Sequence, residues 1–427
     1  MEQYQSLSKE QLLGLCEDLK AQYEGYKAQN LKLDMSRGKP SPEQLDLTMG
    51  MLDILHKGSG MVSGGVDTRN YGMMDGLPEA KKIFADILEV EPGMIIIGGT
   101  SSLNMMYDTV VRALLLGVHG GKEPWIRQGK IKFLCPVPGY DRHFAITEQL
   151  GIEMVGIPMD ENGPDMDLVE QYVNGDPSVK GIWCVPKYSN PGGIVYSDAV
   201  VRRFAALRPA ADDFRIFWDN AYVVHDLYPE RAPKLYNIFE ACKEYGSEDM
   251  VFEFCSTSKV SFSGGGICAM AASKGNIELI KKQMSVQVIC FDKVNQLQHV
   301  RFFKDKDGVL QHMQRHAAVI RPKFELVLGT LREELGGLGI ASWTDPAGGY
   351  FISVDTLPGC ARRTVQLCKE AGVVLTGAGA AFPYGKDPQD QNIRLAPTYP
   401  ELRELEVAAR LFTLCVKIAA AERLLAD

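Results

Sequence analysis

The chain has 427 residues, 45% hydrophobic and 23% charged, with a net charge of −8 at pH 7. This length predicts two or three folding units of ordinary globular composition. The negative charge argues against a nucleic-acid-binding protein that relies on a basic face. No apolar run approaches the roughly 20 residues that span a bilayer, and the N-terminus lacks the features of a signal peptide. We therefore expect no association with nucleic acid or membrane.

Ten cysteines are scattered along the chain, and none forms a C-x-x-C pair. Most of them lie in apolar contexts, which is typical of buried, reduced thiols. Because disulfides are rare in cytosolic proteins, this pattern favours a cytoplasmic location. The sequence predicts no metal site.

The N-terminal part of the chain predicts helix, then loop. Leucines at helical spacing predict one or two helices over residues 5–34. The segment "SRGKPSPEQLDL" (36–47) is punctuated by glycine and proline and predicts a loop. A helix is expected over 77–88, with proline in its first turn. The segment "MIIIGGTSSLNMMYDTVVRALL" (94–115) then predicts a strand, a glycine turn and a helix.

From there, strand and helix signals alternate up to residue 256. Strands are expected at 130–138, 152–159, 179–186, 214–219 and 250–256, and helices at 140–151 and 197–209. Such alternation indicates a largely parallel sheet with helices on both faces. We assign it to a large domain over residues 60–320.

The last hundred residues alternate differently. Helices are expected at 321–335, 362–372 and 401–425, and strands at 349–355, 373–379 and 392–397. This pattern predicts a smaller α/β domain over 321–427, which the N-terminal segment 1–59 is expected to join.

Four short segments lie at the predicted carboxyl ends of strands, the edge at which open α/β sheets bind ligands. They are "GGTSSLN" (98–104), "YSNPGG" (188–193), "FWDNAY" (217–222) and "STSK" (256–259). Taken singly, the first three have ordinary explanations as helix caps and turns. The fourth holds a lysine, Lys259, which is costly to bury unless it is paired or chemically altered.

One ligand, pyridoxal 5′-phosphate (PLP), would explain all four segments together. Asp219 would pair with the pyridinium nitrogen, and Lys259 would form a Schiff base with the aldehyde. Asn190 and Tyr222 would donate hydrogen bonds to the phenolate oxygen. The phosphate is expected on three serines, Ser101, Ser102 and Ser256.

In the order and spacing of these residues the sequence resembles the class I aminotransferases of PLP fold type I, specifically a divergent subgroup of the aspartate aminotransferases. The resemblance runs from about residue 33 to about residue 420. It implies a mainly parallel, seven-stranded type of sheet between helices, with a smaller α/β domain. It also implies ping-pong transamination in which Lys259 transfers the proton, and a homodimer with shared active sites.

Further segments resemble landmarks of this family, and their roles rest on that resemblance. Tyr71 in "TRNYG" matches the tyrosine that reaches the partner subunit's cofactor phosphate. Tyr140 in "CPVPGYDRH" matches the aromatic residue that stacks on the pyridine ring. Arg394 in "NIRLAPTYP" matches the arginine that binds the substrate α-carboxylate, which Gly38 in "SRGKP" and Asn190 also approach.

The sequence also departs from the family pattern. Ile267 occupies the position at which the family usually has an arginine for the cofactor phosphate, and a nearby Ser/Gly run, 261–266, offers hydroxyls and backbone N–H groups instead. On the resemblance we expect aspartate and 2-oxoglutarate as substrates. Candidate cations for a second carboxylate are Arg37, Lys39, Arg69 and Lys293.

Other functions stay open at this point. On the same fold, the protein would be an aminotransferase for alanine or an aromatic amino acid, a C–S lyase or a decarboxylase. A nucleotide-binding α/β enzyme would need a G-x-G-x-x-G or P-loop element after its first strand, and "GGTSSLN" supplies neither. A non-catalytic binding protein would have little reason to keep both Lys259 and Asp219.

Overall fold

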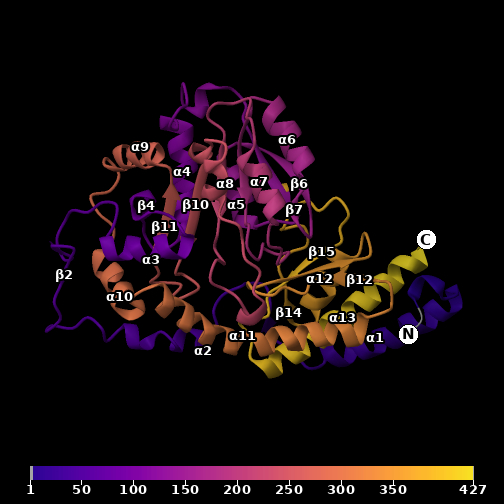
Figure 1. Cartoon of the computed structure of the whole chain (residues 1–427). Coiled ribbons are helices and arrows are strands. Elements are labelled where there is room, and N and C mark those ends of the chain that lie inside the picture. The colour runs from indigo at the N-terminus through magenta and orange to yellow at the C-terminus, as the bar shows by residue number, and fades with distance from the viewer. Residues whose placement is uncertain (1–2, 427) are drawn as a thin grey trace.

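A large, mostly parallel sheet dominates the computed structural model of the chain, which describes residues 3–426 (Figure 1). Its strand order is β4-β11-β10-β9-β8-β5-β6-β7. The strands are β4 (Ile95–Ile97), β5 (Lys132–Val137), β6 (Glu153–Asp160), β7 (Gly163–Pro164), β8 (Val179–Cys184), β9 (Arg215–Asp219), β10 (Val251–Ser256) and β11 (Cys268–Ala272). The five strands from β10 to β6 run parallel, whereas β11 and β7 are antiparallel to their neighbours.

Helices cover both faces of this sheet. They are α3 (Pro78–Leu88), α4 (Ser102–Leu116), α5 (Asp141–Gln149), α6 (Met166–Gly175), α7 (Asp198–Ala205), α8 (Ile238–Lys243), α9 (Lys274–Met284) and α10 (Lys293–Phe303). One buried cluster joins α3, α6, α7 and α8 to the sheet, and a second joins α4, α5 and α9. Leu134 packs in the first cluster, whereas its neighbours Phe133 and Cys135 pack in the second, because successive strand side chains point to opposite faces.

The rest of the chain forms a second packed layer. Its elements are α1 (Lys9–Lys27), β1 (Leu33–Asp34), α2 (Pro42–Asp46), α11 (Lys306–Leu335), β12 (Ala341–Trp343), β13 (Ile352–Thr356), α12 (Ala361–Glu370), β14 (Val373–Val374), β15 (Asn392–Leu395) and α13 (Leu402–Ala426). Strands β12, β13 and β15 form an antiparallel sheet, β1 pairs with β14, and α1 packs against α13 (Figure 1). A short hairpin, β2 (Val62–Ser63) with β3 (Val66–Asp67), completes the strands.

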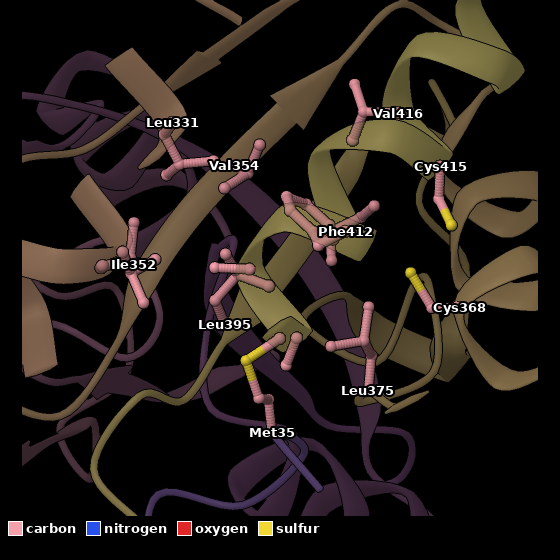
Figure 2. Close-up of a cluster of buried hydrophobic side chains, with 14 of the residues drawn as sticks. Met35, Leu331, Ile352, Val354, Cys368, Leu375, Leu395, Phe412, Cys415 and Val416 are labelled. Carbon is pink, nitrogen blue, oxygen red and sulfur yellow. The ribbon is translucent and has the colours of Figure 1, made fainter. Parts of the chain in front are cut away.

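The second layer has its own core, in which apolar side chains from a strand pair and two helices converge. Figure 2 shows Leu331, Ile352, Val354, Leu395 and Phe412 in this cluster. Phe412 is fully buried, and α13 presents a nearly continuous apolar surface to its neighbours. This packing fixes β15, and with it Arg394.

The predicted fold class is confirmed, with local differences. The sheet has eight strands, because the two-residue β7 pairs with the edge strand β6. The helix expected from residue 321 begins at Lys306, capped by Asp305. Helices α6, α8, α9 and α10 and strand β11 were not predicted, and the segment 36–47, expected to be a loop, contains the short helix α2. The division into domains at residues 60 and 321 stays a prediction, and α11 continues through residue 321.

Two further expectations concern membranes and cysteines. Within residues 3–426, no helix combines the length and the apolar character that crossing a bilayer requires. All ten cysteines are free thiols, and most of them are buried.

Gly372 sets the connection between the N-terminal segment and the second layer. Its φ is +91°, and a Cβ there would lie 2.0 Å from the Leu31 carbonyl oxygen. The carbonyl of Gly372 also accepts the hydrogen bond from Leu33 N that opens the β1–β14 pairing. We predict that Gly372→Ala destabilises the protein by about 1–3 kcal/mol, because alanine is strained at this φ and collides with the neighbouring backbone.

The measurement is the midpoint of urea unfolding. Gly14→Ala is the matched control, because Gly14 lies inside α1 with open space around its Cα. This control should be neutral or stabilising by up to about 1 kcal/mol. An unchanged midpoint for Gly372→Ala would contradict the constraint.

Candidate active site

The four sequence segments meet at the carboxyl edge of the large sheet. Asp219 is the last residue of β9, Ser256 the last of β10, and Asn190 follows β8. They line one narrow cavity of about 50 Å³, the inner cavity. Its polar lining consists of Ser101, Ser102, Tyr140, Asn190, Asp219, Tyr222, Ser256, Ser258 and Lys259. The structure thus brings together every residue predicted to hold the cofactor except Tyr71, which is 75% exposed and lines neither this cavity nor the one next to it.

Asp219 is a buried carboxylate with one open oxygen. It is 3% exposed, and its Oδ2 lies 3.0 Å from His143 Nε2. His143 is fixed in turn by stacking on Trp183, with ring centroids 4.4 Å apart. Asp219 Oδ1 is buried and has no hydrogen-bond partner within residues 3–426. A carboxylate so placed can receive a charged N–H donor from a ligand in the cavity.

His143 is a residue that the sequence prediction missed. It lies three residues after Tyr140, within the first turn of α5, and so shares that helix's approach to the sheet edge. The available signal was a histidine one helical turn from a predicted site residue, on a segment already assigned to the site.

Asn190 and Tyr222 present donors to the inner cavity. Asn190 Oδ1 accepts a hydrogen bond from Arg394 Nη1 at 3.1 Å, which leaves its amide N–H groups for the cavity. Tyr222 is 3% exposed, and burial raises its pKa well above the usual range. It therefore stays a phenol and can donate its proton in a hydrogen bond.

Lys259 is an amine that the protein holds without a bonding partner. Within residues 3–426 its Nζ forms neither a hydrogen bond nor an ion pair, and it lies 5.1 Å from the centre of the Tyr222 ring. Burial lowers its pKa, and the charge of Asp219 only partly opposes this effect. A lowered pKa increases the fraction of neutral amine, the form that attacks carbonyl groups.

The serines of the inner cavity and the N-terminus of α4 could bind an anion, although among the described residues no arginine lines that cavity. Ser101 caps α4 by accepting from Leu103 N at 3.2 Å, and Ser102 begins that helix. Ser102 is 7% exposed, and its hydroxyl has no partner among the described residues. Ser256 and Ser258 lie opposite, with their Oγ atoms 2.8 Å apart. The helix N-terminus and these hydroxyls suit a phosphate.

Ile267 lies in the core and outside the inner cavity. The hydroxyls suggested as a replacement for the missing arginine bond elsewhere: Ser261 contacts Thr257 and His299, and Ser263 donates to the Ser258 carbonyl. Lys259 is therefore the only cationic side chain among the described residues that line the inner cavity.

A wider cavity of about 440 Å³, the outer cavity, opens beside the inner one. Tyr140, Asn190, Tyr222 and Lys259 line both, and the outer cavity adds Ser36, Arg37, Gly38, Lys39, Asp141, Arg142, Phe351, Thr376 and Arg394. Gly38 packs so closely on Phe351 that a Cβ would lie 2.3 Å from the Phe351 ring. Gly38 and Arg394 therefore line the same cavity, and their role at the substrate stays a prediction.

Arg394 is held from three sides. Its Nη1 donates to Asp141 Oδ1 at 2.8 Å as well as to Asn190, and its Nη2 donates to Thr376 Oγ1 at 3.3 Å. The guanidinium lies 4.9 Å from the Phe351 ring centre, and only 9% of the side chain is exposed. Asp141 was not predicted although it follows Tyr140 in a segment already assigned to the site, because its partner Arg394 lies 253 residues away. Thr376, 18 residues before Arg394, was not predicted either.

Two of the candidate cations for a second carboxylate lie outside both cavities. Arg69 is exposed and pairs with Asp67 at 2.6 Å. Lys293 is 2% exposed within its own chain. Arg37 and Lys39 remain, and Arg142 joins them in the outer cavity.

This geometry agrees with what comparisons with known proteins show. The model of the family described as aspartate amino-transferase matches residues 7–427. The chain belongs to the aspartate aminotransferase family. An aspartate aminotransferase of Corynebacterium glutamicum is 45% identical over 406 residues, covering 95% of this chain and 94% of that protein.

Other members and more distant structures extend the comparison. A Mycolicibacterium smegmatis protein named as an aminotransferase is 49% identical over 426 residues, which cover 99% of each chain. The crystal structure of an aspartate transaminase of Corynebacterium glutamicum superposes with a TM-score of 0.96 at 43% identity and covers 99% of each chain. An α-aminoadipate aminotransferase of Thermus thermophilus shares the fold, with a TM-score of 0.72 at 20% identity over 92% of this chain and 93% of its own. The predictions of PLP fold type I and of an aminotransferase are confirmed.

This family member buries a second acid outside the inner cavity. Glu253 on β10 is 3% exposed and accepts at 2.9 Å from Nδ2 of Asn220, the residue that follows Asp219. Burial raises the pKa of Glu253 from 4.5 to about 8. Between these two values the folded chain holds a proton that the unfolded chain releases. The stabilisation that the protonated Glu253 side chain gives the folded state is therefore complete below pH 4.5 and is lost as the pH rises toward 8.

We predict that Glu253→Gln, which keeps a neutral side chain at every pH, unfolds at a higher temperature than wild type at pH 8. The difference should correspond to a few kcal/mol and should shrink toward pH 5. Thermal unfolding across pH 5–8 measures it, with the exposed Glu148→Gln as the control. A gap that widens toward pH 5 would contradict the assignment.

Proposed function

We propose that this protein is a PLP-dependent aminotransferase that moves the amino group of L-aspartate to 2-oxoglutarate. The observation that supports the cofactor is the juxtaposition of Asp219 and Lys259. An open carboxylate oxygen and an unpaired amine with a lowered pKa share one cavity. Few ligands other than PLP require both groups at once.

The residues of the inner cavity fit PLP. Asp219 Oδ1 would accept from the pyridinium nitrogen, with His143 fixing the carboxylate, and Asn190 and Tyr222 would donate to the phenolate oxygen. The phosphate would lie on Ser101, Ser102, Ser256 and Ser258 at the N-terminus of α4, and Tyr140 would cover the ring. When bound, PLP supplies an electron sink that stabilises negative charge at the substrate Cα.

The chain's own residues then perform the binding and the proton transfer. Arg394 binds the substrate α-carboxylate with its planar donor fork and orients the Cα–H bond toward Lys259. Within each half-reaction the Lys259 amine would move one proton between two carbons: as a general base it would take the Cα proton of the amino donor, and as a general acid it would deliver it to C4′ of the bound cofactor. In the second half-reaction it would carry out the reverse transfer and protonate Cα of the former oxo acid. Tyr140 and Phe351 line the outer cavity together with Lys259, and their rings would limit the water around this proton once a substrate is bound.

The charge of the outer cavity supports a dicarboxylate substrate. Besides Lys259, its lining carries four cationic side chains, Arg37, Lys39, Arg142 and Arg394, and one carboxylate, Asp141. Within residues 3–426, Arg37 and Arg142 form no ion pair. Aspartate and 2-oxoglutarate each bring a second carboxylate that would offset this surplus.

A homodimer with shared active sites belongs to the same proposal. Tyr71 is 75% exposed although it is a large, largely apolar side chain, and Val62 in β2, nine residues earlier in the chain, is exposed as well. Cover by a second subunit would explain this exposure, and Tyr71 would then reach the partner's cofactor phosphate. The free cysteines favour a cytoplasmic location, which completes the proposal.

Lys259→Ala tests the catalytic core of the proposal. We predict that transamination falls by at least roughly a thousandfold, because the variant loses both the amine that binds the aldehyde and the proton carrier. The exposed Lys274→Ala should retain wild-type activity. Borohydride reduction followed by peptide mass spectrometry should attach the cofactor to the Lys259 peptide in wild type only. Near-normal turnover by Lys259→Ala would refute the mechanism.

Substrate choice is tested separately, with Arg142→Ala. We predict that kcat/KM for aspartate falls by about ten- to a hundredfold, while kcat/KM for alanine changes less than about threefold, since alanine lacks the second carboxylate. Arg127→Ala, an exposed arginine outside both cavities, is the matched control. A wild-type enzyme that prefers alanine or an aromatic amino acid would refute aspartate as the substrate. Ammonia released without an oxo acid would indicate a lyase.

A further inference from the structure

Arg394, which the proposed function assigns to the substrate α-carboxylate, already contacts a carboxylate of the protein, that of Asp141. Asp141 Oδ1 lies 2.8 Å from Arg394 Nη1, and the Asp141 side chain is 33% exposed, in the outer cavity. Asp141 is the first residue of α5, directly after Tyr140, so the start of that helix delivers it to the site. A carboxylate of the protein thus contacts the guanidinium that the proposed function assigns to the substrate.

The remaining donors of Arg394 leave little room for a second carboxylate. Both hydrogens of Nη1 are engaged, one by Asp141 and one by Asn190. Nε is buried by protein atoms and has no partner, so a ligand in the outer cavity cannot reach it. Nη2 donates one hydrogen to Thr376 and has one left. Bidentate binding needs two parallel N–H groups, and Nη2 alone offers only one.

We propose that Asp141 is a resident counter-ion that occupies Arg394 in the absence of substrate and is displaced from Nη1 by the substrate α-carboxylate. The proposal rests on the proposed function, because it takes Arg394 as the α-carboxylate site. Burying an unpaired guanidinium is costly, and Asp141 removes this cost while the site lacks a substrate. Thr376 and Asn190 keep the guanidinium plane in place during the exchange.

Asp141 has a place to go once displaced. Its exposed part faces the outer cavity, whose lining also carries Arg37, Lys39 and Arg142. The exchange therefore leaves no carboxylate without nearby cations. Because Asp141 competes with every α-carboxylate, it weakens the binding of all substrates by one common factor and leaves the chemical step unchanged.

The test is Asp141→Asn, which keeps the size and one acceptor oxygen but removes the charge. Maleate, an unreactive dicarboxylate, serves as the probe, and titration calorimetry on the cofactor-loaded enzyme measures its Kd. We expect Asp141→Asn to bind maleate about fivefold or more tightly than wild type. Steady-state kinetics should show KM lowered by a similar factor for aspartate and for alanine, with kcat within about twofold.

Two variants serve as matched controls. Asp141→Glu keeps the charge and should restore the wild-type Kd. Asp198→Asn removes an exposed acid from the same first position of α7, where it has no side-chain partner within residues 3–426, and should leave the Kd unchanged. This control separates competition at Arg394 from the general effect of a helix N-terminal charge.

The possible outcomes are distinct. Weaker maleate binding by Asp141→Asn would show that Asp141 positions Arg394 and would overturn the proposal. Unchanged binding in an active enzyme would overturn it as well and leave the proposed function intact. If wild type neither binds maleate nor transaminates, the proposed function itself fails, and this inference fails with it.

Discussion

The buried carboxylate of Asp219 is the constraint on which the rest of the site depends. Ending β9 with an acid that is 3% exposed is unfavourable unless donors satisfy it. The protein supplies a partner for only one of the two carboxylate oxygens: His143 contacts Oδ2, and Oδ1 has no hydrogen-bond partner among the described residues. His143 in turn requires Trp183 beneath it and α5 at the sheet edge. The positions of Trp183 and α5 therefore support the carboxylate through His143.

The two cavities differ in the charged and polar groups that line them. The inner one holds a carboxylate, an amine and hydroxyl donors, so it selects a ligand by hydrogen-bond pattern. The outer one carries a surplus of cations at its wall, so it selects by charge. Lys259 lines both cavities. Its amine is therefore within reach of a cofactor in the inner cavity and of a substrate in the outer cavity. Arg394 connects them as well, through its hydrogen bond to Asn190.

Local sequence patterns could predict the cavity-lining residues that lie at the carboxyl ends of strands or a few residues beyond them. Asp219, Asn190, Ser256 and Lys259 each come with a strand signal and a turn signal, and parallel strands bring their carboxyl ends to one edge. Contacts between segments far apart in the chain have no such local signal. Asp219 and His143 are separated by 76 residues, and Arg394 and Asp141 by 253.

Elements whose stability comes from tertiary packing were also beyond prediction from the sequence. Strand β11 has the sequence CAMAA, which carries little strand propensity, and it is stabilised by pairing with β4 and β10 on both sides. The first half of α11, by contrast, contains His312 and His316, which are buried and bonded to each other at 3.0 Å. The same half also carries apolar residues at helical spacing, Val309, Met313, Ala317 and Ile320, so a start before residue 321 was readable from the sequence and was missed.

No arginine lies near Ile267 in the sequence, and the inner and outer cavities accordingly differ in how they could bind an anion. In the outer cavity, the guanidinium of Arg394 pairs with the carboxylate of Asp141, which we propose the substrate displaces. At the phosphate end, the described residues offer hydroxyls and the N-terminus of α4, which carries a partial positive charge that no side-chain motion can withdraw. A cofactor that stays bound through both half-reactions needs only a fixed field. A substrate that must enter and leave at every turnover needs a site whose charge can be exchanged, and the displacement of Asp141 from Arg394 that we propose would meet this need.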